Sequence, residues 1–364
     1  MAFYQEPEGT GREYRTAYLE GIERVLADKQ ASSHAQREAF FAPDCSSAGA
    51  YEASLGPLRA EFVKMLGWPL TDASLRAQPP KLLSETLVAE DETSHITRQQ
   101  WEVLPGVPLY AMLFLPKTEG PHTLVVSQHG GQGTPEITDG FYRESANYHY
   151  MTRRLRQRGF AVLAPQLCLW TPEAGPEKNR PLLDRRFKEL NGSLAAFELF
   201  GLQRLLDGVL ARPDIRSKPL PDGSPAPLGM CGLSYGGFYT LFMTALDTRI
   251  RAAVSSCFFN QRYAVSKDFF DWSWQGSGTR FQDEQVAGLV CPRPLYLEVG
   301  RNDELFPVDK AEELAPRAAA WWEKLGRGGD FAFRVHEAGH DFDTGDEGLD
   351  FLERRLKATP VTPA

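Results

Sequence analysis

The sequence predicts an α/β protein in which a mostly parallel central sheet carries helices on both faces. From residue 123 onward, apolar segments of strand length alternate with segments of helical period. Repeated strand–helix units of this kind form parallel sheets, because each helix returns the chain to the start of the next strand. The strand candidates also run as short continuous apolar segments, as in "TLVVSQHG". Strands that are buried on both faces have this composition.

Length and composition exclude several classes of protein. The chain has 364 residues, 42% hydrophobic and 24% charged, as an ordinary globular protein does. Its net charge of −8 gives no electrostatic footprint for nucleic acid or anionic lipid. No apolar run approaches the ~20 residues that span a bilayer, and the first fifteen residues contain no signal-peptide core. We therefore expect a cytoplasmic protein with neither nucleic-acid nor membrane partners.

The cysteines give no indication of a metal site or of disulfides. Their number is odd, they are widely scattered, and no C-x-x-C pair occurs. Neither a zinc knuckle nor a disulfide framework is therefore indicated, and the chemistry predicted below is expected to use no metal and no organic cofactor. The five positions are Cys45, Cys168, Cys231, Cys257 and Cys291.

The order of elements predicts two parts. Residues 12–67 show apolar side chains at helical spacing, and three strand-like segments follow, "SETLVAED", "TRQQWEVL" and "PLYAMLFLP". We expect residues 1–80 to form a helical extension packed on a main domain at 81–364. Two connections, at about 168–192 and 258–285, exceed ordinary loop length and are expected to form lids or substrate walls.

One motif, "HEAGH" from His336 to His340, matches the H-E-x-x-H of zinc peptidases. Such a zinc site needs a helix, because only there does a spacing of four residues bring both imidazoles to one face. Glycines at 326, 328, 329, 339, 345 and 348 surround or interrupt the motif, and "FAFRVH" has the aromatic and β-branched composition of a strand. Local structure therefore favours a different role for His340.

A second motif predicts nucleophilic catalysis by serine. Gly232 to Gly236 spell G-x-S-x-G between an apolar strand and an apolar helix, the setting of a nucleophile elbow with Ser234 at its tip. An acid and a base should follow in the order Asp, His. Asp303 follows the strand "LYLEVG" and His340 follows the next strand, so both are expected at the carboxyl edge of the sheet. Asp303 capping a helix, with Glu304 as the acid, is the alternative.

Each residue of this set has a defined chemical role. His340 would take the proton of Ser234, because imidazole accepts protons near neutral pH. Asp303 would hold the imidazole in the correct tautomer. The oxyanion would be bound by the backbone amide of Tyr235 and by one amide of the glycine-rich loop "HGGQG", for which we take Gly131 among the neighbouring candidates 130–132. His129 is expected to shape this loop.

Together, "HGGQG", "GLSYGG", "GRNDELFP" and "GHDF" resemble the α/β-hydrolase superfamily from about Leu82 to the C-terminus. Two of these motifs, "GLSYGG" and "GRNDELFP", are similar to two groups, the bacterial esterases near dienelactone hydrolase and acetyl-xylan esterase, and the catalytic domain of the prolyl-oligopeptidase family. The peptidases carry a large β-propeller, whereas about eighty residues of helical pattern precede the sheet here. The resemblance therefore implies an ester hydrolase acting on a small-molecule ester, with a peptidase or amidase as the alternative. A silent, ligand-binding homologue is the third interpretation.

The sequence indicates the residues that would contact the substrate less clearly than it indicates the catalytic ones. Four aromatic residues in the two long connections would line a pocket or, alternatively, anchor the loops to the body of the protein. For the N-terminal helices, capping of the sheet edge and formation of a homodimer are both open. The four aromatic candidates are Trp170, Phe270, Trp272 and Trp274.

Overall fold

The computed structural model describes residues 4–168, 180–220, 223, 225–265 and 270–357. One sheet of nine strands runs through the body in the order β1-β2-β3-β5-β4-β6-β7-β8-β9. The first strands form an antiparallel meander that ends on β5, and all pairings from β5 to β9 are parallel. The predicted strand–helix alternation and mostly parallel sheet are confirmed.

The strands coincide closely with the apolar segments of the sequence. Each of the five strands from β4 to β8 is buried along its whole length, which explains their continuous apolar composition. Their bounds are β1 Lys81–Glu90, β2 Ser94–Leu104, β3 Val107–Pro116, β4 Leu124–Gln128, β5 Ala161–Pro165, β6 Leu228–Leu233, β7 Ala252–Ser256, β8 Leu295–Gly300 and β9 Phe331–His336.

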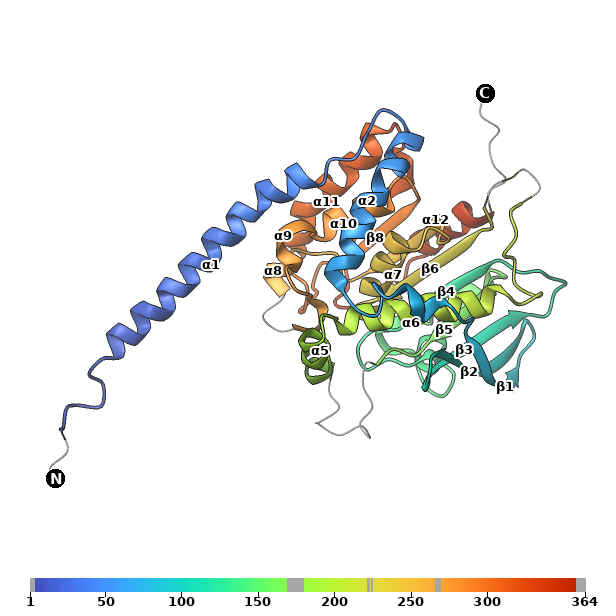
Figure 1. The fold of residues 1–364 in the computed structure, drawn as a ribbon. Helices are drawn as coiled ribbons and strands as arrows, with labels where there is room; N and C mark the ends of the chain where they lie inside the picture. The colour runs from blue at the N-terminus through green and yellow to red at the C-terminus, as the bar shows by residue number, and fades with distance from the viewer. Residues whose placement is uncertain (1–3, 169–179, 221–222, 224, 266–269, 358–364) are drawn as a thin grey trace.

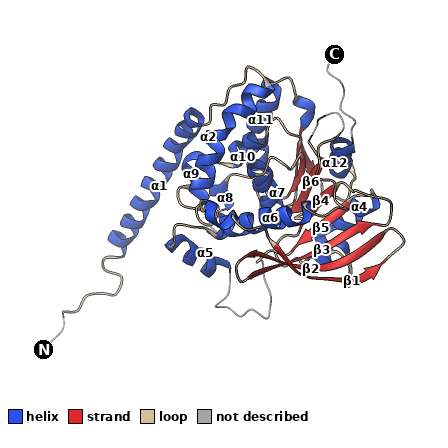
Figure 2. Cartoon of the chain, turned by 45° about the vertical axis from the view of Figure 1, so that its right-hand side comes forward, coloured by secondary structure: helices blue, strands red, loops and turns tan. Residues whose placement is uncertain are grey.

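Helices cover both faces of the sheet (Figures 1 and 2). Helices α4 and α12 close one apolar layer, and α2, α6, α7, α10 and α11 close the other. The α-helices are α1 Arg12–Phe40, α2 Ala48–Leu66, α3 Pro135–Asp139, α4 Met151–Gln157, α5 Arg180–Glu189, α6 Leu194–Leu210, α7 Tyr235–Leu246, α8 Arg262–Val265, α9 Ser277–Arg280, α10 Asp283–Val290, α11 Val308–Lys324 and α12 Glu347–Lys357. Short 3-10 turns lie at Ala73–Arg76, Ala146–Tyr148, Phe270–Trp272 and Gly328–Asp330.

Alternation along the strands supplies both apolar layers. In β4, Leu124 and Val126 point into the α7 layer while Val125 points into the α12 layer, as the period of two in a strand requires. Burial of these side chains on both faces removes the central strands from water. The sheet is thus a rigid platform, and the loops that follow its parallel strands are held at one edge.

The two helices of the N-terminal extension differ in how much they contact the body of the protein. Helix α2 packs on the body through buried Tyr51, Leu55, Phe62 and Leu66. In α1, by contrast, only Ser33 and Arg37 are buried, and the helix projects away from the body over most of its length (Figures 1 and 2). Within the described residues, no helix combines the length and the apolarity needed to cross a bilayer.

Candidate active site

Ser234 occupies a strained turn between a strand and a helix. Strand β6 ends at Leu233 and α7 begins at Tyr235, so Ser234 alone makes the reversal. Its backbone has φ 61° and ψ −122°, a conformation that costs on the order of 1–3 kcal/mol for a residue with a Cβ and persists only where surrounding structure enforces it. The Ser234 amide donates to the carbonyl of Ser256 on β7 at 2.9 Å. The sharp turn is the geometry of a nucleophile elbow.

Glycine is required on both sides of the serine because backbones pass too closely for a Cβ. A Cβ on Gly232 would lie 2.4 Å from the carbonyl oxygen of Gly236, and one on Gly236 would lie 2.0 Å from that of Gln128. The G-x-S-x-G pattern is therefore a steric requirement of this turn rather than a flexible loop. It brings β6, α7 and the end of β4 into direct backbone contact.

Asp303 and His340 meet at the carboxyl edge of the sheet. His340 Nδ1 donates to Asp303 Oδ2 at 2.8 Å, and the Asp303 side chain is fully buried. The other carboxylate oxygen, Oδ1, accepts the amides of Leu305 at 2.8 Å and Phe306 at 3.0 Å. These bonds fix the carboxylate, which in turn fixes the ring and leaves Nε2 as the basic nitrogen. Glu304, the alternative acid, is exposed.

Ser234 lies beside this pair but is not bonded to it. Among the described residues, no hydrogen bond joins Ser234 to His340. Ser234 and the His340–Asp303 pair both approach the end of β7, at Ser256 and Cys257. Ser256 accepts the Ser234 amide, and the Cys257 sulfur lies within 4.8 Å of the nearest ligand atoms of Asp303 and His340. All three predicted residues therefore converge on the end of one strand.

Cys257 is a site residue that the sequence reasoning missed. Its backbone has φ 48°, and its thiol donates to the carbonyl of Asp341 at 3.2 Å. Burial raises the pKa of the Cys257 thiol well above its usual value, and the nearby Asp303 charge adds to this effect. The thiol is therefore neutral and holds the histidine loop in place, leaving Ser234 as the nucleophile candidate.

Several further contacts hold the loop that carries His340. Asn147 donates through Nδ2 to the His340 carbonyl at 2.9 Å and accepts the amide of Phe342 at 2.8 Å. The amide of Asp343 donates to Glu298 Oε1 at 3.0 Å. Glu298 is buried on β8, and this burial raises the pKa of its carboxyl group to about 7. The loop is thus fastened on both sides of the histidine.

The glycine-rich loop after β4 passes close to the serine. The amide of Gly130 already donates to the Tyr148 hydroxyl at 2.9 Å, so it is not available to a substrate. A Cβ on Gly130 would lie 2.9 Å from that of Ser234, which shows how closely the loop approaches the nucleophile candidate. The described residues offer no acceptor to the amide of Gly131 or of Gln132. Tyr235 opens α7, so its amide has no intrahelical acceptor either.

His129 shapes this loop. Its Nε2 accepts the amide of Leu167 at 2.9 Å, and its Nδ1 therefore carries the proton that is donated to the Gly130 carbonyl at 2.8 Å. Complete burial lowers the pKa of His129 to about 4. A neutral ring that ties the ends of β4 and β5 together has a positioning role and no basic nitrogen to spare.

The aromatic candidates divide between the site and the core. Trp272 stacks on Phe306 with ring centroids 5.2 Å apart, and Phe306 stacks on His340 at 5.5 Å. Trp272 also meets the Tyr235 ring edge-on at 4.7 Å. Trp274 instead packs against Phe62 and Phe242 in the core, so it anchors the insertion. Trp170 and the side chain of Phe270 lie outside the described residues.

A buried charged network lies under Tyr235. Arg180 pairs with Asp271 at 2.6 Å and with Glu198 at 2.7 Å, and its guanidinium lies 4.9 Å from the Tyr235 ring centroid. The Tyr235 hydroxyl donates to Asp271 Oδ2 at 2.9 Å. Tyr239 accepts from Arg180 at 2.9 Å and also donates to Glu198. Local sequence patterns gave no sign of this network, because its members lie far apart in the chain.

The H-E-x-x-H motif is not helical. His336 ends β9, and the described turn that follows carries Glu337 to His340. His336 is buried with Nε2 3.8 Å from the Cys257 sulfur, and this burial lowers its pKa. The two histidines therefore do not share a helical face, and the strand predicted for "FAFRVH" is confirmed.

Comparisons with known proteins agree with this architecture. Three solved structures align with 86–87% of the chain, a glucuronoyl esterase from Solibacter usitatus, a methylesterase, and a "putative acetyl xylan esterase" from Bacteroides fragilis. Their TM-scores are 0.65, 0.60 and 0.58, their identities 13%, 18% and 13%, and the aligned shares of their own chains 94%, 69% and 85%. This chain has the α/β-hydrolase fold.

Sequence comparison adds one curated relative. The chain is 26% identical over 256 residues to "Putative hydrolase YtaP" of Bacillus subtilis (strain 168), which covers 66% of this chain and 81% of that protein. No family model matches the sequence. The structural neighbours are named as esterases, and the fold that the sequence-based resemblance implies is the one observed.

Proposed function

We propose that the protein is a serine hydrolase that cleaves carboxylic esters through an acyl-enzyme. The 2.8 Å bond between His340 Nδ1 and Asp303 Oδ2, beside the strained turn of Ser234, carries this proposal. The bond leaves Nε2 as the one basic nitrogen of the ring, as a general base for a serine hydroxyl requires. Neighbours named as esterases support the choice of ester chemistry.

Catalysis would proceed in two steps. In the first, His340 Nε2 takes the proton of Ser234 Oγ while the oxygen attacks the ester carbonyl, and the same proton then passes to the leaving alcohol. In the second, a water molecule activated by His340 attacks the acyl-enzyme and releases the acid. Asp303 stabilises the imidazolium that forms in both steps. In this free structure Ser234 and His340 are not bonded, and catalytic hydrogen bonds often tighten only when substrate is present.

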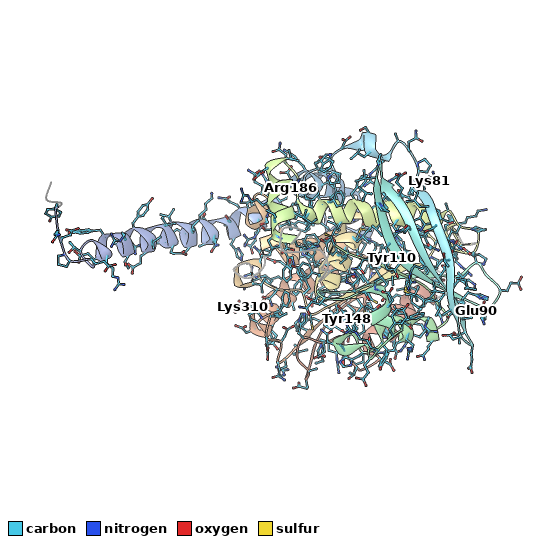
Figure 3. All side chains as sticks on the ribbon, turned by 90° about the horizontal axis from the view of Figure 1, so that it is seen from below. Lys81, Glu90, Tyr110, Tyr148, Arg186 and Lys310 are labelled. Atoms are coloured by element: carbon cyan, nitrogen blue, oxygen red, sulfur yellow. The ribbon has the colours of Figure 1, made fainter. Side chains whose placement is uncertain are left out.

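The negative charge on the carbonyl oxygen would be bound by two backbone amides. The amide of Tyr235 has no intrahelical acceptor and lies at the N-terminus of α7, where the helix dipole favours an anion. Gly131 supplies the second amide in our proposal. Its neighbour Gly130 is excluded because its amide donates to Tyr148. The Tyr148 label in Figure 3 marks the side chain that holds this loop.

A direct test is intact-protein mass spectrometry after treatment with a fluorophosphonate, followed by peptide mapping. We expect a single adduct on Ser234 and loss of p-nitrophenyl acetate hydrolysis, with the Ser234→Ala variant folded, unlabelled and inactive. A chelator control should leave the rate unchanged. Activity that survives in Ser234→Ala would refute the mechanism. Turnover of a p-nitroanilide in preference to the ester would assign the same residues to an amidase.

The identity of the acyl group can be tested with a small set of ester substrates. The neighbours are named for glucuronoyl, methyl and acetyl ester cleavage, so we propose an ester of a carbohydrate or a sugar acid as the substrate class. Acetylated xylan, a methyl glucuronate ester and p-nitrophenyl esters of increasing chain length would be compared by kcat/KM. A preference for long-chain p-nitrophenyl esters over both carbohydrate esters would reject this class.

A further inference from the structure

Helix α1 carries a large apolar face that the protein itself leaves uncovered. Six large side chains between residues 14 and 26 are exposed, from 40% for Ile22 to 73% for Tyr14. At 100° per residue, all six fall within an arc of roughly 140°. The set, which we call the α1 face, consists of Tyr14, Tyr18, Leu19, Ile22, Val25 and Leu26.

The helix is held firmly at one end only. Arg37 donates through Nη1 to the Gly278 carbonyl at 2.7 Å, and the Phe40 and Phe41 rings pack edge-on against Phe281 at 5.6 and 6.4 Å. These contacts fix the direction in which the rest of α1 leaves the body. Its 29 residues span about 44 Å at about 1.5 Å per residue. Figure 3 shows the N-terminal part of the helix standing apart from the rest of the described structure.

A helix in this position lacks the usual source of stability. Most helical stability in proteins comes from packing an apolar face, and an isolated helix in water is marginal. The α1 face exposes on the order of 700 Å², given that a large aromatic side chain carries roughly 150–250 Å². Patches on monomeric proteins rarely exceed roughly 300–600 Å², whereas one side of a standard protein interface buries about 800 Å².

We propose that the α1 face pairs with the α1 face of a second copy of this chain, in an antiparallel arrangement about a two-fold axis near residue 20. Such an axis sets Tyr18 against Ile22 of the partner subunit and Tyr14 against Leu26 of the partner subunit. The face is thus complementary to itself, as a two-fold interface requires. The area available on each copy is close to that of a standard interface.

Charge favours the same orientation. The N-terminal part of the face contains Arg15, and the C-terminal part is flanked by Glu23. Antiparallel pairing sets Arg15 opposite Glu23 of the partner subunit, whereas parallel pairing sets like charges together. Over residues 12–30 the four basic and four acidic side chains cancel, which disfavours binding to an anionic membrane. The charged residues of this segment are Arg12, Glu13, Arg15, Glu20, Glu23, Arg24, Asp28 and Lys29.

Analytical ultracentrifugation of the full chain over a range of concentrations tests the proposal. We expect wild type to sediment at twice the 40.7 kDa of one chain, and a Tyr18→Glu/Ile22→Glu variant to be monomeric. The matched control is Thr16→Glu/Ala17→Glu, which adds the same charge to the same helix outside the α1 face, and it should stay dimeric. All four positions are exposed or half-buried, so folding of the body is unaffected.

Two outcomes would overturn the proposal. One is that the wild-type protein stays monomeric at every concentration. Binding of this monomer to anionic vesicles through α1 would then assign the face to a membrane. The other is a Tyr18→Glu/Ile22→Glu variant that dimerises as well as its control. Orientation is tested by oxidation of single-cysteine variants. Leu19→Cys lies near the axis, so its two copies are close together and should form a disulfide-linked dimer. The two copies of Tyr14→Cys lie at opposite ends of the interface and should not cross-link. Efficient cross-linking of Tyr14→Cys would show a parallel pair.

Discussion

Arg180 Nε and Asp271 Oδ2 lie 2.6 Å apart in a buried ion pair, although each residue comes from a different one of the two long insertions. The pair lies directly under Tyr235, whose hydroxyl donates to the same carboxylate. The insertions are therefore joined to each other at the residue that follows the nucleophile candidate. This arrangement connects the two insertions to the residue whose amide we propose as an oxyanion donor.

The first prediction concerns this ion pair. Asp271→Asn should lower the free energy of unfolding by about 2 kcal/mol, because Arg180 loses one of its two buried carboxylate partners and keeps Glu198. We also expect kcat/KM to fall roughly 10- to 100-fold as the Tyr235 amide moves. Tyr235→Phe is the matched control, since it removes one hydroxyl and should cost only about 1 kcal/mol. Urea unfolding and ester kinetics on both variants measure the difference; equal effects would contradict the assigned role.

The second prediction separates the two candidate acids. Asp303→Asn should reduce kcat by roughly 10⁴-fold with the fold intact, because an amide favours the wrong tautomer of His340. Glu304→Gln should change kcat little, since that side chain is exposed while Asp303 is bonded to the ring. Stopped-flow or steady-state hydrolysis of p-nitrophenyl acetate measures both. A larger loss in Glu304→Gln would transfer the role of the acid to that residue.

The success of sequence reasoning differed between local and long-range features. The strand–helix order followed from residue periodicity, and the meeting of Asp303 with His340 followed because the carboxyl ends of parallel strands share one edge. The contact of Cys257 with the histidine loop, and that of Tyr148 with Gly130, could not be predicted in this way. Both depend on tertiary positions of side chains that carry no local signal, such as a cysteine with positive φ.

The N-terminal extension shows the same limit. The apolar spacing within residues 12–67 predicted helices, and the first of them is α1, Arg12–Phe40. The spacing also predicts packing of this extension on the main domain. Helix α2 packs there through buried side chains, whereas the large apolar side chains of α1 between residues 14 and 26 are exposed. Periodicity identifies an amphipathic face, but it does not say whether that face meets the same chain or another one.

The third prediction concerns the effect of low pH on the stability that His129 contributes. Its folded pKa of about 4 lies below the ordinary value of 6.5, so the unfolded state binds more protons between these pH values. Stability supplied by the neutral ring should therefore be lost as the pH falls from about 6.5 to 4, by up to about 3 kcal/mol. Urea unfolding across this range, in wild type and His129→Gln, isolates the contribution. Parallel stability curves for the two proteins would show that the ring does not titrate in this way.

The fourth prediction concerns Glu298, for which stability should change with pH in the opposite direction. Burial raises the pKa of Glu298 from 4.5 to about 7 in the folded protein, so here the folded state binds more protons within that window. Stability should therefore fall as the pH rises from about 4.5 to 7, by up to about 3 kcal/mol, and level off above.

Glu298→Gln provides the measurement. The variant keeps the acceptor for the Asp343 amide but cannot ionise, so its stability should exceed that of wild type by an amount that grows from pH 4.5 to 7. Because His129 acts in the opposite direction over much of this range, only the difference between wild type and variant at each pH is informative. If the buried carboxylate instead charges at an ordinary pKa, that difference will be constant above pH 5.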